Sequence, residues 1–297
     1  MRKFSLLMLG QIFGASSVLF IKISHIQAGF LAADRLLLAA LILLPLFLRE
    51  RRNLAAAPDA AKQPVWTRSI IPGVLLGLHL ATWNLGARMT TATNASLIVN
   101  LVPLVMPFLI FFLLREKPRS YELIGTLVAV GGLTLLSLGA LQLDRQTLAG
   151  DGICLVSMLL VAGYLALGRR NSSGGLWAYI VPLYAIGGVS AFLISLPFGN
   201  PLAQPLSAED IIAILGLTLV CTVIGHSINN WAMRHFRAQF VSLMAATQFI
   251  WAGIGAWFLF NESPQSGFYL SSLIILAGVA VAVVPRLVHH FSAKENP

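Results

Sequence analysis

The sequence predicts an all-α integral membrane protein whose ten transmembrane helices form two inverted five-helix repeats. Three observations lead to this fold class. First, 57% of the 297 residues are hydrophobic and only 10% are charged, with a mean hydropathy of +0.82, whereas soluble domains carry about 25% charged residues. Second, apolar stretches of membrane-spanning length recur from end to end. Third, the second half of the chain repeats part of the first. An ordinary soluble fold is therefore excluded.

An apolar helix of about 20 residues spans the hydrocarbon layer of a bilayer. The chain starts Met1-Arg2-Lys3, and we interpret the apolar run that follows as the first span, because no convincing signal-cleavage site follows it. The ten predicted spans are Phe4–Ile23, Ala28–Leu48, Ser69–Met89, Ala92–Leu114, Tyr121–Leu141, Leu148–Leu167, Leu176–Leu196, Ile211–Met233, Phe240–Phe260 and Gly267–Val284. The two longer connections are Arg49–Arg68 and Pro197–Asp210.

The basic residues predict the direction of each span. If the N-terminus is cytoplasmic and all ten segments cross, sixteen of the 20 lysines and arginines fall on the cytoplasmic side. Lys22, Arg88 and Arg145 fall outside, and Arg35 lies within the second span. This asymmetry is typical of a correct topology. We therefore expect a multi-pass protein of the cell (inner) membrane with both termini cytoplasmic. The same distribution accounts for the net charge of +9, so we expect no nucleic-acid partner.

A constant offset of 146 residues aligns the two halves without a gap. Asn84 falls on Asn230, Arg88 on Arg234 and Glu116 on Glu262, among twelve identities in 49 positions. Five helices per repeat is an odd number, so the two copies cross the membrane in opposite senses. The predicted repeats are residues 1–141 and 148–288. Inverted repeats of this kind hold a binding site near the bilayer midplane and expose it alternately to each side, which favours a transporter over a receptor or an enzyme.

At these residues the chain resembles the EamA-type branch of the drug/metabolite transporter (DMT) superfamily. The first copy reads Asn94-Ala95-Ser96-Leu97, Pro103 and Arg115-Glu116-Lys117-Pro118; the second reads Val241-Ser242-Leu243 and Asn261-Glu262-Ser263-Pro264. Gly150-Asp151-Gly152 also looks like the family's opening to its second repeat. The sequence departs where Phe249 stands at the position matching Pro103, which makes a matching kink in the ninth helix doubtful. The resemblance implies export of small metabolites, often amino acids, without specifying which one.

We therefore predict a secondary transporter of a small-molecule substrate in the lipid bilayer, with a facilitator or channel of the same architecture as the alternative. A membrane-embedded enzyme is the third reading, but nucleotide-binding, dinucleotide-binding and metal-helix motifs are missing, so we expect no catalytic residues, metal site or cofactor. Coupling to protons or another ion remains open, as does the choice between monomer and homodimer. Cys154 and Cys221 fall within apolar stretches and are interpreted as packing residues.

His79 and Trp83 are the first candidates for the substrate cavity. They are four residues apart on the third span, hence on one helix face, and His79 lies near mid-membrane. Imidazole can bind a polar substrate or carry a proton, and indole gives an apolar wall with one donor. The alternative is a packed, hydrogen-bonded histidine with an interfacial tryptophan.

Further polar or aromatic side chains at depth are also cavity candidates, because polar groups in a membrane usually face its protein interior. They are Gln11, Asn100, Tyr164, Gln248 and Trp251, with Asp34, Arg35, His226 and Asn229 as secondary candidates. Each of them could instead join helices, and Asp34 and Arg35 could anchor the second span near the interface, with Arg35 snorkelling outward. Pro103 and Pro107 predict a bend in the fourth span beside the cavity.

Overall fold

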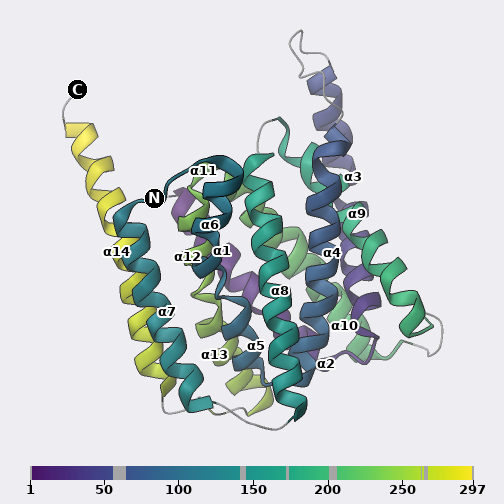
Figure 1. The fold of residues 1–297 in the computed structure, drawn as a ribbon. Helices are drawn as coiled ribbons and strands as arrows, with labels where there is room; N and C mark the ends of the chain where they lie inside the picture. The colour runs from purple at the N-terminus through teal and green to yellow at the C-terminus, as the bar shows by residue number, and fades with distance from the viewer. Residues whose placement is uncertain are drawn as a thin grey trace.

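The computed structural model describes residues 2–55, 65–140, 145–171, 174–200, 206–261, 263 and 267–295, and every regular element in these ranges is a helix (Figure 1). Eight helical segments are long and apolar enough to cross a membrane. Ser120–Leu135 and Gly267–Val283 are two shorter apolar helices at the positions of the predicted fifth and tenth spans. The predicted fold class, with ten transmembrane helices, is therefore confirmed.

Several spans consist of more than one helical element. The first repeat contains α1 (Arg2–Ala15), α2 (Ser17–Ile23), α3 (Ala28–Ala55), α4 (Val65–Met89), α5 (Ala92–Val99), α6 (Val102–Leu114) and α7 (Ser120–Ala140). The second contains α8 (Arg145–Arg170), α9 (Leu176–Ser195), the 3₁₀ turn η1 (Leu196–Phe198), α10 (Ala208–Leu215), the π-helix η2 (Gly216–His226), α11 (Ser227–His235), α12 (Ala238–Ala245), α13 (Gln248–Phe260) and α14 (Gly267–Glu295).

The two longer connections are shorter than hydropathy suggests. Helix α3 continues to Ala55, beyond the predicted end at Leu48, because its charged last turns remain helical after the apolar stretch ends. At the other connection, the Ser207 hydroxyl accepts from the Asp210 amide and the Asp210 carboxylate accepts from the Ser207 amide. This capping box starts α10 at Ala208. Residues 56–64 and 201–205 lie outside the described ranges.

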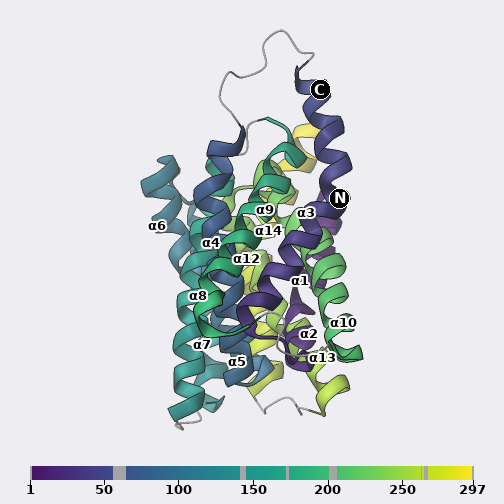
Figure 2. The same ribbon diagram turned by 90° about the vertical axis from the view of Figure 1, so that its right-hand side faces the viewer.

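The packing of the helices follows the inverted repeat. We number the ten spans in chain order and call spans, or residues, at equivalent positions of the two repeats mates. Span 1 is thus the mate of span 6. Two of the most extensive contacts join mates directly: α3 with α9 (spans 2 and 7) and α7 with α14 (spans 5 and 10), the second pair visible at the left of Figure 1. The contact of α4 with α8 (spans 3 and 6) has its counterpart in α1 with η2 (spans 1 and 8). Figure 2 shows the same helices from the side. The halves therefore pack about a pseudo-two-fold axis.

Residues at matching positions also have matching roles. Arg88 donates to the carbonyls of Ile21 and Ile26, around the turn from α2 to α3. Its mate Arg234 donates to the carbonyls of Gly174 and Gly175, in the turn from α8 to α9. Both guanidinium groups thus stabilise the turn after the first span of their own repeat, since its carbonyls lack helical partners.

The fourth and ninth spans are interrupted at the same repeat position. Helix α5 ends at Val99 and α6 begins at Val102, while α12 ends at Ala245 and α13 begins at Gln248. The absence of a matching proline made a kink in the ninth span doubtful, but the helix is interrupted there all the same. Bonds of the 3₁₀ type form there, from the Ala246 amide to the Leu243 carbonyl and from the Thr247 amide to the Met244 carbonyl.

The two prolines of the fourth span occupy different places relative to its interruption. Pro103 is in the first turn of α6, where a missing amide hydrogen costs little. The chain breaks just before it, at Asn100 and Leu101. Pro107 lies inside α6, which continues through it. The span is thus interrupted just before Pro103 and not at Pro107.

The α7–α14 pair packs backbone against backbone. A Cβ atom added to Gly125 would lie 2.5 Å from the Gly278 carbonyl oxygen, and one added to Gly278 would lie 2.5 Å from the Gly125 carbonyl oxygen. Close approach through small residues is a common way for membrane helices to associate, because dispersion contacts replace the hydrophobic effect in lipid. This contact joins the last helices of the two repeats.

Candidate substrate cavity

A cavity of about 80 Å³ lies between the repeats. Three spans of each repeat form its wall: spans 1, 3 and 4, and their mates 6, 8 and 9. The lining residues are Gly14, Ser17, His79, Leu80, Trp83, Val99, Asn100, Val102, Val161, Tyr164, Leu165, His226, Asn229, Val241, Ala245 and Gln248. The cavity is therefore on the pseudo-two-fold axis, and it is small compared with the 300–1,000 Å³ that is usual for ligand pockets.

His79 is fixed in this wall by its neighbour on α8. Its Nδ1 lies 2.8 Å from the Ser157 hydroxyl and 3.0 Å from the Ser157 carbonyl oxygen, and that hydroxyl donates to the His79 carbonyl. Since a carbonyl can only accept, Nδ1 carries the proton, which leaves Nε2 as an acceptor in the neutral ring. His226, from the other repeat, lies edge-on with its ring centroid 6.5 Å away. The cavity thus brings together two imidazoles from matching spans.

Ser17 is a polar group that the sequence did not single out. Its hydroxyl oxygen accepts from Trp83 Nε1 and from Arg35 Nη1, each at 3.3 Å. Among the described residues, the Ser17 hydroxyl donates to no acceptor. Its own hydrogen is therefore available to a group in the cavity.

Three amides form a chain across the repeats. Gln248 Nε2 donates to Gln11 Oε1 at 2.7 Å, and Gln11 Nε2 donates to Asn229 Oδ1 at 2.9 Å. Gln248 and Asn229 line the cavity, and Gln11 lies behind them. The chain thus fixes both orientations: it leaves the Asn229 NH₂ group as a donor and Gln248 Oε1 as an acceptor.

Arg35 is a buried cation with neutral partners. Its side chain has no exposed surface. Nε donates to Thr222 Oγ1 at 2.9 Å and Nη1 donates to Ser17, while Nη2 has no hydrogen-bond partner among the residues that the structure describes. Thr222 belongs to η2, where its hydroxyl donates to the Leu217 carbonyl five residues back. Arg35 thus lies directly behind the cavity wall, beside the widened helix of span 8.

The structure brings together seven of the eleven cavity candidates. His79, Trp83, Asn100, Tyr164, Gln248, His226 and Asn229 line the cavity. Gln11 and Arg35 bind lining residues from behind. Trp251 is outside the wall and is 37% exposed. Asp34 is half-buried and shares a helix face with the exposed Leu37 and Leu41. Gly14 and Ser17 were missed because small residues give no signal of depth or direction.

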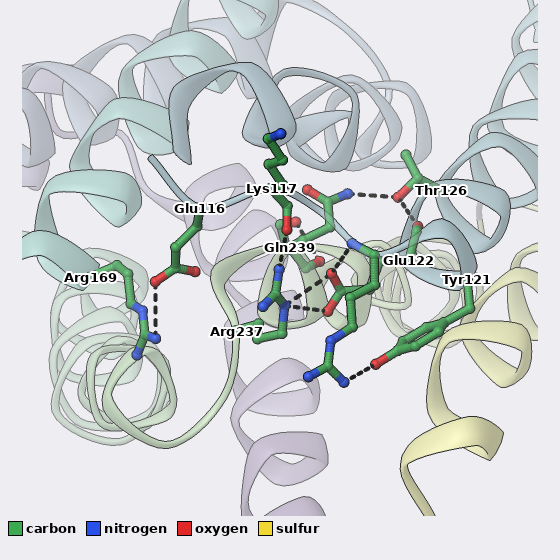
Figure 3. Close-up of polar contacts among 10 residues, drawn as sticks. Glu116, Lys117, Tyr121, Glu122, Thr126, Arg169, Arg237 and Gln239 are labelled. Carbon is green, nitrogen blue, oxygen red and sulfur yellow. Dashed lines mark hydrogen bonds and ion pairs between the residues drawn. The ribbon is translucent and has the colours of Figure 1, made fainter. Parts of the chain in front are cut away.

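A second polar group joins the repeats at the end of the bundle where α1 begins. We call Glu116, Lys117, Glu122, Arg169 and Arg237 the end cluster (Figure 3). Arg237 Nε donates to both oxygens of Glu122, at 3.0 and 3.1 Å, and its Nη2 donates to the Lys117 carbonyl. Arg169 Nη2 donates to Glu116 at 3.2 Å. In both ion pairs the acid belongs to the first repeat and the arginine to the second.

The Glu122–Arg237 pair of the end cluster is shielded on its acidic side and is not repeated by symmetry. Glu122 is fully buried, and its carboxylate also accepts from the Arg119 amide at 3.0 Å. Exposed ion pairs contribute about 0–1 kcal/mol, whereas removing one partner of a buried pair costs more because it leaves the other charge unpaired. At the offset of 146, the mates of Glu122 and Arg237 are Phe268 and Thr91, which cannot form an ion pair. The two ends of the cavity are thus held differently.

Comparison with known proteins gives the family. The EamA-like transporter family matches residues 2–138 and, separately, 148–284. An uncharacterized transporter of Archaeoglobus fulgidus is 27% identical over 284 residues, which cover 92% of this chain and 94% of that protein. A protein of known crystal structure shares the fold with a TM-score of 0.75 at 15% identity, over 96% of this chain and 98% of that one. The chain is therefore a membrane transporter that belongs to the EamA-like transporter family.

Proposed function

We propose that the protein is a secondary transporter that exports small polar metabolites, such as amino acids, by alternating access. The observation that carries this proposal is the cavity on the pseudo-two-fold axis, to which each repeat contributes three spans. Since the repeats are inverted, rocking one against the other would close one end of this cavity and open the other. A mixed lining of imidazole, amide, hydroxyl and indole groups suits a small polar molecule.

The end cluster supports alternating rather than continuous access. Its ion pairs connect the repeats at one end of the cavity, so they must break if the repeats separate there. From the sorting of the basic residues, we expect this end to be cytoplasmic. A facilitator or channel of the same architecture would not require these ion pairs to break and re-form. We expect no enzymatic activity.

A transport assay in proteoliposomes tests the proposal. The purified protein is reconstituted, loaded with a pool of amino acids and other small metabolites, and assayed for counterflow of each labelled compound. We expect saturable exchange of a restricted set of compounds. Flux that does not saturate and shows no counterflow would favour the facilitator, and no flux of any compound in the pool would contradict the proposal.

A cavity-filling variant supplies the control. Ala245 lines the cavity, so Ala245→Phe places a ring in a space of about 80 Å³ and should abolish exchange. Ala280→Phe makes the same change at an exposed position of α14 that does not line the cavity, and it should leave exchange unchanged. Exchange that persists in Ala245→Phe would show that the cavity is not the substrate route.

A further inference from the structure

We propose that Arg35 makes this cavity selective for substrates that carry a carboxylate, which reach its charge through the Ser17 hydroxyl. The proposal rests on the proposed transport function and specifies its substrate class. Three features carry it: a buried guanidinium without an acidic partner, a polar link from it to the cavity, and a cavity wall without acids.

The first feature is the missing counter-ion. A charged side chain within a membrane is costly and normally pairs with an opposite charge or faces a polar cavity. Arg35 is fully buried, yet within the described ranges its partners are the two neutral hydroxyls of Ser17 and Thr222, and Nη2 has none. A buried charge of this kind is costly, so replacing it by an apolar side chain would stabilise an ordinary contact between helices. A purely structural role therefore does not account for Arg35.

The second feature is the link to the cavity. Ser17 lines the cavity and accepts from both Arg35 Nη1 and Trp83 Nε1. With its oxygen occupied by two donors, the hydroxyl can donate its hydrogen only toward a further acceptor. A carboxylate oxygen in the cavity is such an acceptor, and the neighbouring positive charge strengthens the bond.

The third feature is the sign of the surrounding charge. None of the lining residues within the described part of the chain is Asp or Glu. Asp34, next to Arg35 in sequence, points along the face of α3 that carries Leu37 and Leu41, whose side chains are 38% and 65% exposed. An anion in the cavity would therefore meet one buried positive charge and no acid in its wall, whereas a cation would meet repulsion.

The remaining groups extend the recognition to a second polar group. The Asn229 NH₂ group donates, while Gln248 Oε1 and His79 Nε2 accept. An amino acid would use these acceptors for its ammonium group, and a simple carboxylic acid would leave them to water. Both kinds of molecule carry a carboxylate, and the assay below distinguishes amino acids from simple carboxylic acids.

The experiment measures charge selectivity in proteoliposomes. The probes are a pool of amino acids, the matching pool of amino-acid amides, and the matching pool of deaminated acids, each assayed for counterflow with the full-length protein. We expect the wild type to exchange acids at least tenfold faster than their amides. Exchange of the deaminated acids as well would identify the carboxylate alone as the requirement. Their exclusion would identify amino acids.

Variants connect this selectivity to Arg35. Arg35→Gln should bring the ratio of acid to amide exchange close to one, and Arg35→Lys should restore part of it. Ser17→Ala should lower the ratio in protein that remains monodisperse, although Trp83 Nε1 and Arg35 Nη1 lose their acceptor. Arg88→Gln is the matched control, because Arg88 is a partly buried arginine bound to carbonyls away from the cavity. It should leave the ratio unchanged even if it lowers stability.

The outcomes distinguish the two proposals. If the wild type exchanges the amides as fast as the acids, or if the ratio is unchanged in both Arg35→Gln and Ser17→Ala, the carboxylate inference is wrong while the transport function stands. If the wild type exchanges no compound of any pool, the transport function fails first, and the inference fails with it.

Discussion

Trp83 and His79 contribute two different properties to the cavity wall, its shape and a fixed hydrogen-bond acceptor. The Trp83 indole is 6% exposed and fills space beside the cavity while its Nε1 donates to Ser17. His79 is 5% exposed and is held by Ser157, so its ring cannot turn freely. One side chain therefore gives shape and the other gives a fixed acceptor, which is the combination that small-molecule sites use for affinity and orientation.

We predict that substitution of either residue weakens substrate binding. Trp83→Ala would enlarge the cavity by most of an indole ring and should weaken binding at least tenfold. His79→Ala removes one acceptor from the cavity and the Nδ1 contacts with Ser157, which should also cost about 1–2 kcal/mol of stability. The measurement is thermal stabilisation in detergent by the substrate identified in the counterflow assay.

The control for this prediction is another tryptophan. Trp257 is 46% exposed and is not part of the cavity lining, so Trp257→Ala should leave substrate binding unchanged. All variants are compared only where they remain monodisperse. If binding is unaffected in both Trp83→Ala and His79→Ala, these two residues have a packing role alone.

The α7–α14 contact shows how one atom can determine the packing of two helices. Gly125→Ala would place a Cβ atom 2.5 Å from the Gly278 carbonyl oxygen, which forces the helices apart. We predict a loss of about 1–3 kcal/mol in the free energy of unfolding, as is typical of overpacked sites. Thermal unfolding of the purified protein in detergent measures it.

Gly131 offers a matched control on the same helix. A Cβ atom added there meets no atom within 4 Å, so Gly131→Ala should be neutral or should stabilise α7 by up to about 1 kcal/mol, because alanine favours helix more than glycine. Equal destabilisation by the two substitutions would mean that the close contact does not limit the packing of this pair.

The helices themselves were the more predictable part of this protein. The ten spans follow from hydropathy and length, because a bilayer demands about 20 apolar residues per helix. The break in the ninth span did not follow, since Ala246 and Thr247 carry no signal such as proline. Helix ends beyond the apolar stretch, as in α3, were also missed, because hydropathy marks the membrane and not the helix.

The cavity was predictable only in part, for a related reason. The depth of a residue along a span can be estimated from sequence. Depth was the reason to predict His79, Trp83 and Asn100 as cavity residues, and all three line the cavity. The rotation of a helix about its axis depends on packing against distant segments, so Trp251 was expected inside and is partly exposed. The link between Ser17 and Arg35 joins two spans through one hydroxyl, a contact that no spacing in the chain encodes.

The orientation in the membrane is a prediction from charge. We expect the connection after α3 to be cytoplasmic and the connection before α10 to be external. Single cysteines at Asn53, an exposed position near the end of α3, and at Ala203 test this in a protein lacking Cys154 and Cys221. An impermeant thiol reagent should label the first only from the cytoplasmic side and the second only from outside. The reverse pattern would invert the proposed direction of every span.

Alternating access requires that the end cluster break when the cavity opens toward it. Glu122 joins the repeats because Arg237 Nε donates to both of its carboxylate oxygens, and its mate at the offset of 146 is Phe268. Glu122→Gln would remove the charge while nearly keeping the shape. We therefore predict a shift of the conformational equilibrium toward a cavity that is open at the end where α1 begins.

Accessibility of a cavity cysteine measures this shift. With Val161→Cys in a protein lacking Cys154 and Cys221, an impermeant reagent applied at the end where α1 begins should react several-fold faster when Glu122→Gln is added, and more slowly when applied at the other end. Arg119→Gln is the control, since the exposed Arg119 side chain binds Tyr121 within its own repeat. Rates that rise at both ends would indicate loosened packing, and rates that stay equal would show that the ion pair does not hold this end of the cavity closed.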